Sequence, residues 1–232
     1  MQRCLSIVLT LILLTGCRET GIRGFWNDVP LIEDNLRMSE DRFVDFAEMA
    51  VAVPETEALE ELDYLFARLQ GDEVAYRLYS EWMDGAFYSI ISPCRNAALY
   101  SRAVEHFVTD GIYHADEYEP FVRRRDWIVL NTPGSKAQVP GFAPDGTRTL
   151  VLVLDISCPS CREALTTLGA DPRFVECRRV AVCCGDGPEP VVPGWEYIFP
   201  GNYEYFFDIK MTPVYFMISP SGEVEQTYTL AI

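Results

Sequence analysis

The most constraining feature of the sequence is a pair of cysteines placed directly after a short apolar run. Residues 151–154 (VLVL) are apolar without interruption, which is typical of a strand covered on both faces. A Cys-Pro-Ser-Cys motif follows at residues 158–161, and a helix is expected from there to about Leu168. We therefore predict that Cys158 lies at the first turn of this helix, with Cys161 one turn later on the same face.

This placement favours redox chemistry at the two thiols. The first turn of a helix presents unpaired N–H groups and the positive end of the helix dipole, so we expect a lowered pKa at Cys158. Cys158 would then be the nucleophile, and Cys161 would attack the mixed disulfide and release the product. Pro159 suits the first turn, where a missing N–H costs nothing. Structural disulfides and zinc knuckles share this spacing, but we predict neither a metal nor a cofactor here.

The residues around the motif form short stretches that predict strands and turns. Residues 145–146 (Asp-Gly) predict a turn between two strands, and residues 179–184 predict a second buried strand. Residues 212–218 and 224–228 flank a Ser-Pro-Ser-Gly turn and are expected to pair as an antiparallel hairpin. The predicted order is strand, CxxC helix, strand and hairpin, with Pro213 at the start of the hairpin.

Two stretches resemble the membrane-tethered thioredoxin-like proteins of the ResA/TlpA type. They are residues 151–161 and residues 210–218 (KMTPVYFMI). The resemblance implies an α/β thioredoxin-like domain over residues 131–232, with a central mixed sheet and flanking helices. It also implies that the peptide between Thr212 and Pro213 is cis and packs against the CxxC motif, leaving the adjacent backbone free to pair with a substrate chain.

An all-α helical domain is expected before it, over residues 39–130. Apolar residues recur there at helical spacing in about five segments, and the third segment is expected to bury Val74, Leu78 and Trp82. This half resembles the uncharacterised helical domain that precedes thioredoxin-like domains in Bacteroidetes lipoproteins. The matching stretches are residues 25–28, 42–46, 92–100 and 131–142.

The N-terminus is typical of an exported protein. Residues 1–16 contain a ten-residue largely apolar run, too short to span a bilayer, and predict a signal peptide. The sequence Leu-Thr-Gly-Cys that ends at Cys17 resembles a lipoprotein lipobox, which implies a lipid anchor on that cysteine. Arg18 in the next position favours the outer membrane, facing the periplasm. Residues 17–38 are expected to form a tether.

The net charge and the composition limit the partners of the protein. A formal charge of -16 would repel nucleic acid, which excludes nucleic-acid binding. With 49% hydrophobic residues, the chain can bury a sizeable core. The partners we expect are protein thiols or disulfides of the cell envelope.

Several side chains near the motif have two competing interpretations. Asp155 and Glu163 are candidates for a carboxylate that assists proton transfer at Cys161, or else a loop cap and a solvated residue. Cys183 and Cys184 end a strand that would finish beside the CxxC motif. They could form a second redox pair or contribute to a zinc site, or they could be buried structural thiols.

Two functions are consistent with these features. The first is an extracytoplasmic thiol-disulfide oxidoreductase, with a reductase favoured over an oxidase. The alternative is a non-catalytic binding or scaffold lipoprotein with a thioredoxin-like module. The alternative gains weight because the chain ends at Ile232, a few residues past the last expected strand, where a thioredoxin fold would add a helix.

Overall fold

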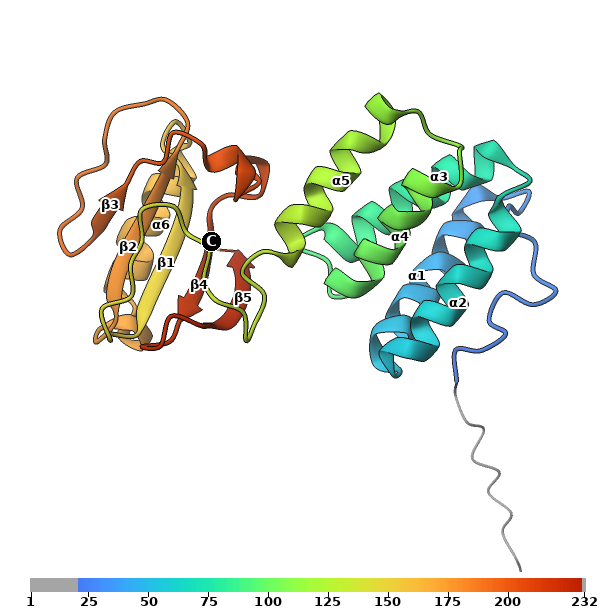
Figure 1. The fold of residues 1–232 in the computed structure, drawn as a ribbon, viewed down its shortest axis with the longest axis horizontal. Coiled ribbons are helices and arrows are strands. Elements are labelled where there is room, and N and C mark those ends of the chain that lie inside the picture. The colour runs from blue at the N-terminus through green and yellow to red at the C-terminus, as the bar shows by residue number, and fades with distance from the viewer. Residues whose placement is uncertain (1–20, 231–232) are drawn as a thin grey trace, which may run out of the picture.

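The chain divides into a helical lobe and a sheet lobe (Figure 1). The computed structural model describes residues 21–230. The expected signal peptide at residues 1–16 and the expected lipidation site Cys17 lie outside the described residues. Within the described part, no helix is both long and apolar enough to cross a bilayer.

Five α-helices build the helical lobe, as expected for residues 39–130. They are α1 (Leu36–Ala52), α2 (Glu55–Leu69), α3 (Glu73–Met83), α4 (Ala97–Thr109) and α5 (Ala115–Val129), with a π-helical turn at Asp84–Tyr88 after α3. Asn35, Asp72 and Asn96 cap the starts of α1, α3 and α4, where their side chains accept hydrogen bonds from backbone N–H groups. Local sequence therefore determines where three of these helices begin.

The buried face of α3 differs from the expected one. Of the expected face (Val74, Leu78 and Trp82), none is fully buried, and Val74 is 77% exposed. The helix instead buries the rings of Tyr76 and Tyr79, whose hydroxyls donate to the Asp110 carboxylate and the Leu31 carbonyl. Because each hydroxyl finds an acceptor, these large rings can occupy the core.

The segment before α1 is docked onto the helical lobe. The Trp26 side chain is 0% exposed, and the buried carboxylate of Glu61 accepts hydrogen bonds from the backbone N of Gly24 at 2.8 Å and of Trp26 at 3.1 Å. Arg68 donates to the carbonyl of Trp26. The expected tether over residues 17–38 is therefore wrong for its described part, since burial of an indole offsets the entropy lost on ordering the segment.

Replacing Glu61 with alanine is expected to lower the free energy of unfolding by about 1–3 kcal/mol, because the buried N–H of Trp26 and the part-buried N–H of Gly24 lose their acceptor. Glu61→Gln keeps one acceptor oxygen and should cost less. Urea unfolding measures both. Glu60→Ala is the matched control, since its exposed ion pair with Arg23 should contribute no more than about 1 kcal/mol. Equal losses in Glu61→Ala and Glu60→Ala would contradict the docking role of Glu61.

The sheet lobe contains a five-stranded mixed sheet with the order β3-β2-β1-β4-β5. Its elements are β1 (Thr149–Asp155), α6 (Pro159–Ala170), β2 (Arg178–Cys184), β3 (Glu196–Ile198), β4 (Val214–Ile218) and β5 (Val224–Leu230). β1, β2 and β3 are parallel, while β4 is antiparallel to both β1 and β5. The expected strand, CxxC helix, strand and hairpin are all confirmed.

The turn expected at residues 145–146 does not join two strands. Before β1, the sheet lobe has only an isolated bridge between Lys136 and Glu223 within the described chain. The Asp145 side chain instead accepts a hydrogen bond from the N of Thr147. Prolines at positions 140 and 144 remove two backbone donors, so this stretch is poorly suited to a strand.

The two faces of the sheet are covered in different ways. α6 packs on one face, with Cys161, Leu165 and neighbouring residues in its core. The other face is covered by irregular segments around residues 137–142 and 203–211, and by Ile90 of the helical lobe. Met211 packs against the cores of both lobes. The segment that leads to Pro213 is thus placed at the boundary between the lobes.

Candidate functional site

The CxxC motif lies where β1 passes into α6. Cys158 is the N-cap residue of α6 and Pro159 occupies its first turn, as expected. The backbone N of Cys158 donates to the Asp155 carbonyl at 3.1 Å. Cys158 is half-buried, whereas Cys161 is 0% exposed and belongs to the core beneath α6. The structure describes both cysteines as free thiols.

The pKa of Cys158 is lowered, and hydrogen bonding is the cause. The largest contribution to the lowered pKa comes from the Ser160 hydroxyl, whose Oγ lies 3.0 Å from the Cys158 Sγ. The backbone and the side chain of Cys161 contribute next. The backbone contribution is the expected effect of the helix N-terminus. The Ser160 hydroxyl was not foreseen, although its place inside the motif is visible in the sequence.

The pKa of Cys161 is shifted in the opposite direction. Burial raises it to about 11, which outweighs the stabilising contact with Thr212. The Cys161 thiol donates to the Thr212 hydroxyl, with Sγ and Oγ1 3.6 Å apart. At neutral pH, Cys158 is therefore the thiol that ionises first and Cys161 retains its proton.

The peptide between Thr212 and Pro213 is cis, as the resemblance implied. Pro213 is buried, and the Thr212 hydroxyl donates to the Ile209 carbonyl at 2.7 Å while it accepts from the Cys161 thiol. The structure therefore brings Cys158, Cys161 and this loop together at one end of the sheet.

The hydrogen bond of the Cys161 thiol goes to Thr212 and not to either candidate carboxylate. One oxygen of Asp155 accepts hydrogen bonds from the N of Ser157 at 2.8 Å and from its hydroxyl at 2.7 Å. Glu163 is exposed. Neither carboxylate is among the main causes of the raised pKa of Cys161. Asp155 therefore acts as a loop cap in this geometry, and Glu163 is a solvated residue.

Cys183 and Cys184 end β2 beside the motif, since Cys184 pairs with Asp155. Their thiols, however, pack in different cores on opposite faces of the sheet, as neighbouring residues of a strand must. Burial raises the pKa of each to about 12. Among the described residues, no three metal-ligating side chains cluster. The geometry therefore favours two structural thiols over a redox pair or a zinc site.

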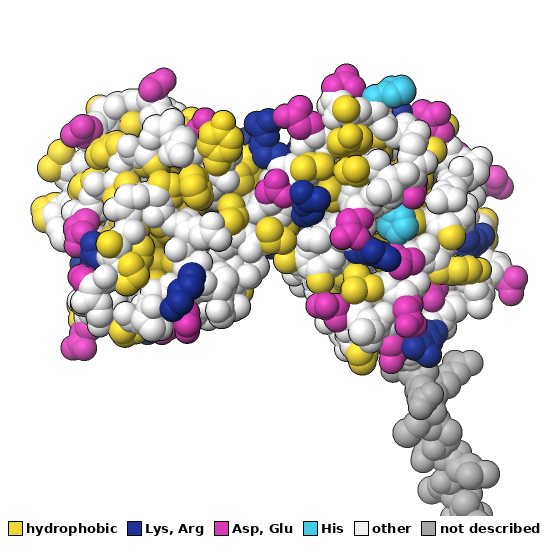
Figure 2. All heavy atoms as spheres, viewed as in Figure 1, with side chains coloured by type: hydrophobic (Ala, Val, Ile, Leu, Met, Phe, Trp, Pro, Cys, Tyr) yellow, Lys and Arg dark blue, Asp and Glu magenta, His cyan; other side chains and the backbone are white. Residues whose placement is uncertain are grey.

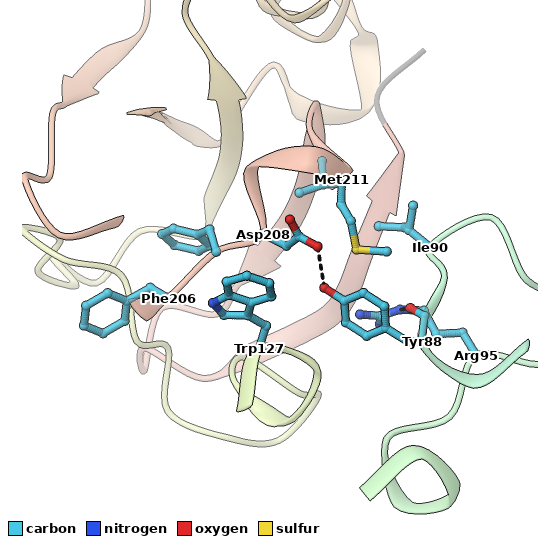
Figure 3. A pocket seen from close by; sticks show the side chains of 9 residues that line it. Tyr88, Ile90, Arg95, Trp127, Phe206, Asp208 and Met211 are labelled. Atoms are coloured by element: carbon cyan, nitrogen blue, oxygen red, sulfur yellow. Dashed lines mark hydrogen bonds between the residues drawn. The ribbon is translucent and has the colours of Figure 1, made fainter. Parts of the chain in front are cut away.

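A tyrosine of the helical lobe contacts the loop that carries Pro213 (Figure 3). The Tyr88 hydroxyl donates to Oδ2 of Asp208 at 2.7 Å, and Oδ1 of Asp208 accepts from the N of Lys210 at 3.0 Å. Burial, and then the charge of Asp208, raise the pKa of Tyr88, so it stays a protonated donor. The contact joins residues 120 positions apart, and no local sequence pattern could have indicated it.

Neighbouring groups hold Tyr88 in place. Its ring packs against that of Tyr100 at a centroid distance of 5.2 Å. The Tyr100 hydroxyl donates to Asp84 at 2.6 Å, and Arg124 pairs with the same carboxylate at 2.9 Å. The helical lobe thus presents a fixed donor to the segment that precedes the Thr212-Pro213 peptide.

Replacing Ser160 with alanine should raise the pKa of Cys158, because the thiolate loses its hydroxyl donor. The rate of alkylation of Cys158 at neutral pH should fall severalfold, and its pH profile should move to higher pH. Mass-resolved iodoacetamide labelling measures both. Ser157→Ala is the control, since Ser157 bonds to Asp155 and should leave the profile in place. An unchanged profile in Ser160→Ala would refute the role of this hydroxyl.

Tyr88→Phe removes only the hydroxyl that donates to Asp208. We expect faster amide hydrogen exchange at residues 210–212, because this turn loses its link to the helical lobe, together with a loss of about 1–3 kcal/mol in unfolding free energy. Tyr64→Phe, at a 42% exposed tyrosine of α2, is the control. If exchange in the turn is the same in both variants, the hydrogen bond does not hold the loop.

Comparison with known proteins supports the fold. No family model matches the sequence, and a search of curated proteins finds no match. Among solved structures, a thioredoxin-like protein from Bacteroides caccae is similar, with a TM-score of 0.70 and 16% sequence identity over 89% of this chain and 87% of that chain. At this identity the similarity shows the fold alone. The chain has a thioredoxin-like fold, with a helical region before the mixed sheet.

Proposed function

We propose that this thioredoxin-like chain is an extracytoplasmic thiol-disulfide oxidoreductase that works through Cys158 and Cys161. The observation that carries the proposal is the opposite shift of the two thiol pKa values, lowered at half-buried Cys158 and raised to about 11 at buried Cys161. An accessible thiol that ionises more easily than usual, beside a buried thiol that keeps its proton, is the arrangement that stepwise thiol-disulfide exchange requires.

The reaction proceeds in two exchanges. The Cys158 thiolate attacks one sulfur of a substrate disulfide, which breaks the S–S bond, forms a mixed disulfide and releases one substrate thiolate that takes up a proton. Cys161 then loses its proton and its sulfur attacks the Cys158 sulfur, releasing the second substrate thiol. The substrate gains two electrons and two protons, and the protein is left with a Cys158–Cys161 disulfide. The thiols carry the electrons, so the proposal needs no cofactor and no metal.

The direction we propose is reduction of substrates. The hydrogen bond from Ser160 stabilises the thiolate and so favours the reduced protein, which by itself opposes this direction. The proposal of a reductase therefore depends on the reduction potential and not on the pKa of Cys158. The reduction potential of the Cys158–Cys161 pair decides between a reductase and an oxidase. A value of about -270 mV supports a reductase, and a value of about -120 mV supports an oxidase.

The cellular setting is part of the proposal. The signal-like residues 1–16 and the lipobox-like sequence at Cys17 support a lipid-anchored protein of the cell envelope, in the outer membrane and facing the periplasm. The partners would be protein thiols or disulfides there, and the charge of -16 argues against nucleic acid. An oxidising compartment is also where such substrates persist.

An insulin-reduction assay tests the catalytic proposal. Cys158→Ser should reduce turnover to the uncatalysed level, because the nucleophile is lost, and Cys161→Ser should accumulate a mixed disulfide on Cys158. Cys177→Ser is the control, since this half-buried cysteine is not part of the proposed chemistry. Equal turnover by wild type and Cys158→Ser would refute the proposal and leave the binding or scaffold alternative.

A further inference from the structure

A groove lies along the boundary between the two lobes. It consists of two adjoining cavities of about 440 and 470 Å³, which share Glu119, Arg123, Trp127 and Glu204. One wall is the exposed side of α5 and the other is the segment of residues 203–210; we call it the lobe groove. Charged side chains of both signs gather where the lobes meet (Figure 2). Each cavity has a size typical of ligand sites in proteins.

Hydrogen bonds between the lobes fix the two walls relative to one another. The indole Nε1 of Trp127 donates to the Glu204 carbonyl at 2.9 Å. The second link is the bond from Tyr88 to Asp208, close to Trp127 in the adjoining cavity (Figure 3). Because both links connect α5 or its neighbours to the opposite wall, the groove is formed before any ligand enters.

The lobe groove leads to the redox site. Ile209 and Lys210 line its wall, and the chain then continues through Met211 to Thr212, whose hydroxyl contacts the Cys161 thiol. The Thr212 hydroxyl also donates to the Ile209 carbonyl at 2.7 Å, so two successive hydrogen bonds connect the groove wall to the Cys161 thiol.

The side chains of the groove suit a polypeptide. Tyr205 is 71% exposed, and Trp127 and Tyr203 are half-buried. Arg123 is exposed, and its pair with Glu119 is a surface pair, 54% and 65% exposed, of the kind that contributes little. Aromatic and arginine side chains are those that carry most binding energy at protein interfaces.

Acidic side chains lie beside the cations, so a ligand of one charge sign is a poor fit. Asp116, Glu119 and Glu204 line the same cavity as Arg123 and Lys210. A phosphate or a nucleic acid would meet these carboxylates directly. A peptide chain, with apolar side chains and charges of either sign, can use the aromatic surface and both kinds of charge.

We propose that the lobe groove binds the polypeptide segment that flanks the reactive cysteine of a substrate, so that the substrates are proteins and not small-molecule disulfides. This inference rests on the proposed function, since it extends the same redox site. It gives the helical lobe a direct part in substrate binding through α5.

The test uses the Cys161→Ser variant of the full chain, which cannot resolve a mixed disulfide. One probe is a peptide of about ten residues, which reaches about 35 Å when extended, with a central cysteine activated as its thionitrobenzoate disulfide. The other is cysteamine activated in the same way. In both, the Cys158 thiolate attacks the sulfur of the probe and thionitrobenzoate leaves as the coloured thiolate. Peptide mapping confirms that Cys158 is the labelled site.

Amide hydrogen exchange of the two adducts is then compared. The proposal predicts slower exchange at residues 119–127 and 203–210 in the peptide adduct than in the cysteamine adduct. Equal exchange in both adducts overturns the inference but leaves the proposed function intact. Failure of both probes to label Cys158 overturns the proposed function, and the inference with it.

A kinetic arm uses variants of the groove. In the Cys161→Ser background, adding Arg123→Ala and Tyr205→Ala should slow peptide labelling, relative to cysteamine labelling, by about tenfold, a loss typical of truncating interface hot spots. Tyr64→Ala, an exposed aromatic on α2, is the matched control and should not change this ratio. An unchanged ratio in the groove variant overturns the proposal.

Discussion

The hydroxyl of Thr212 connects the parts on which this site depends. It accepts a hydrogen bond from the buried Cys161 thiol and donates one to the Ile209 carbonyl. Through this one group, the α6 end of the sheet is held against the cis-proline loop. The same loop is bonded to the helical lobe through Asp208 and Tyr88. The strands, α6 and the helical lobe therefore meet within a few residues of the two thiols.

The chemistry at the site follows from a competition between burial and hydrogen bonding. At Cys161 burial is the larger effect, so the neutral thiol is favoured despite the contact with Thr212. At Cys158 the hydrogen bonds from the Ser160 hydroxyl and the first-turn amides lower the pKa by more than partial burial raises it. Two thiols one helical turn apart thus acquire opposite roles from their surroundings. The same burial makes Cys183 and Cys184 poor nucleophiles.

The order β1, α6, β2, β4 and β5 could be predicted because its signals are local, whereas the short edge strand β3 was not predicted. An apolar run, a cysteine motif with proline at the first helical position and a Ser-Pro-Ser-Gly turn each specify a short stretch of chain. A local pattern also gave a wrong prediction for the buried face of α3. Val74 has helical spacing but lies on the exposed side of α3, because two tyrosines with satisfied hydroxyls fill the core instead.

The remaining features depend on contacts between distant residues. Trp26 docks the supposed tether through Glu61, and Tyr88 reaches Asp208 across the lobe boundary. No spacing in the sequence indicates that Trp26 pairs with Glu61 or Tyr88 with Asp208, because each contact forms only when the helices have packed. The groove beside α5 has the same origin, as its two walls come from different lobes.

We propose that the surroundings of the two thiols make Cys158 the nucleophile and Cys161 the resolving thiol. The most direct test is a site-resolved titration of both thiols in the reduced protein, followed by NMR of the cysteine Cβ carbons. We expect Cys158 to ionise first, below the ordinary cysteine value of 9.0, and Cys161 to ionise only at about 11. Ionisation of Cys161 before Cys158, or of both together near 9.0, would contradict it.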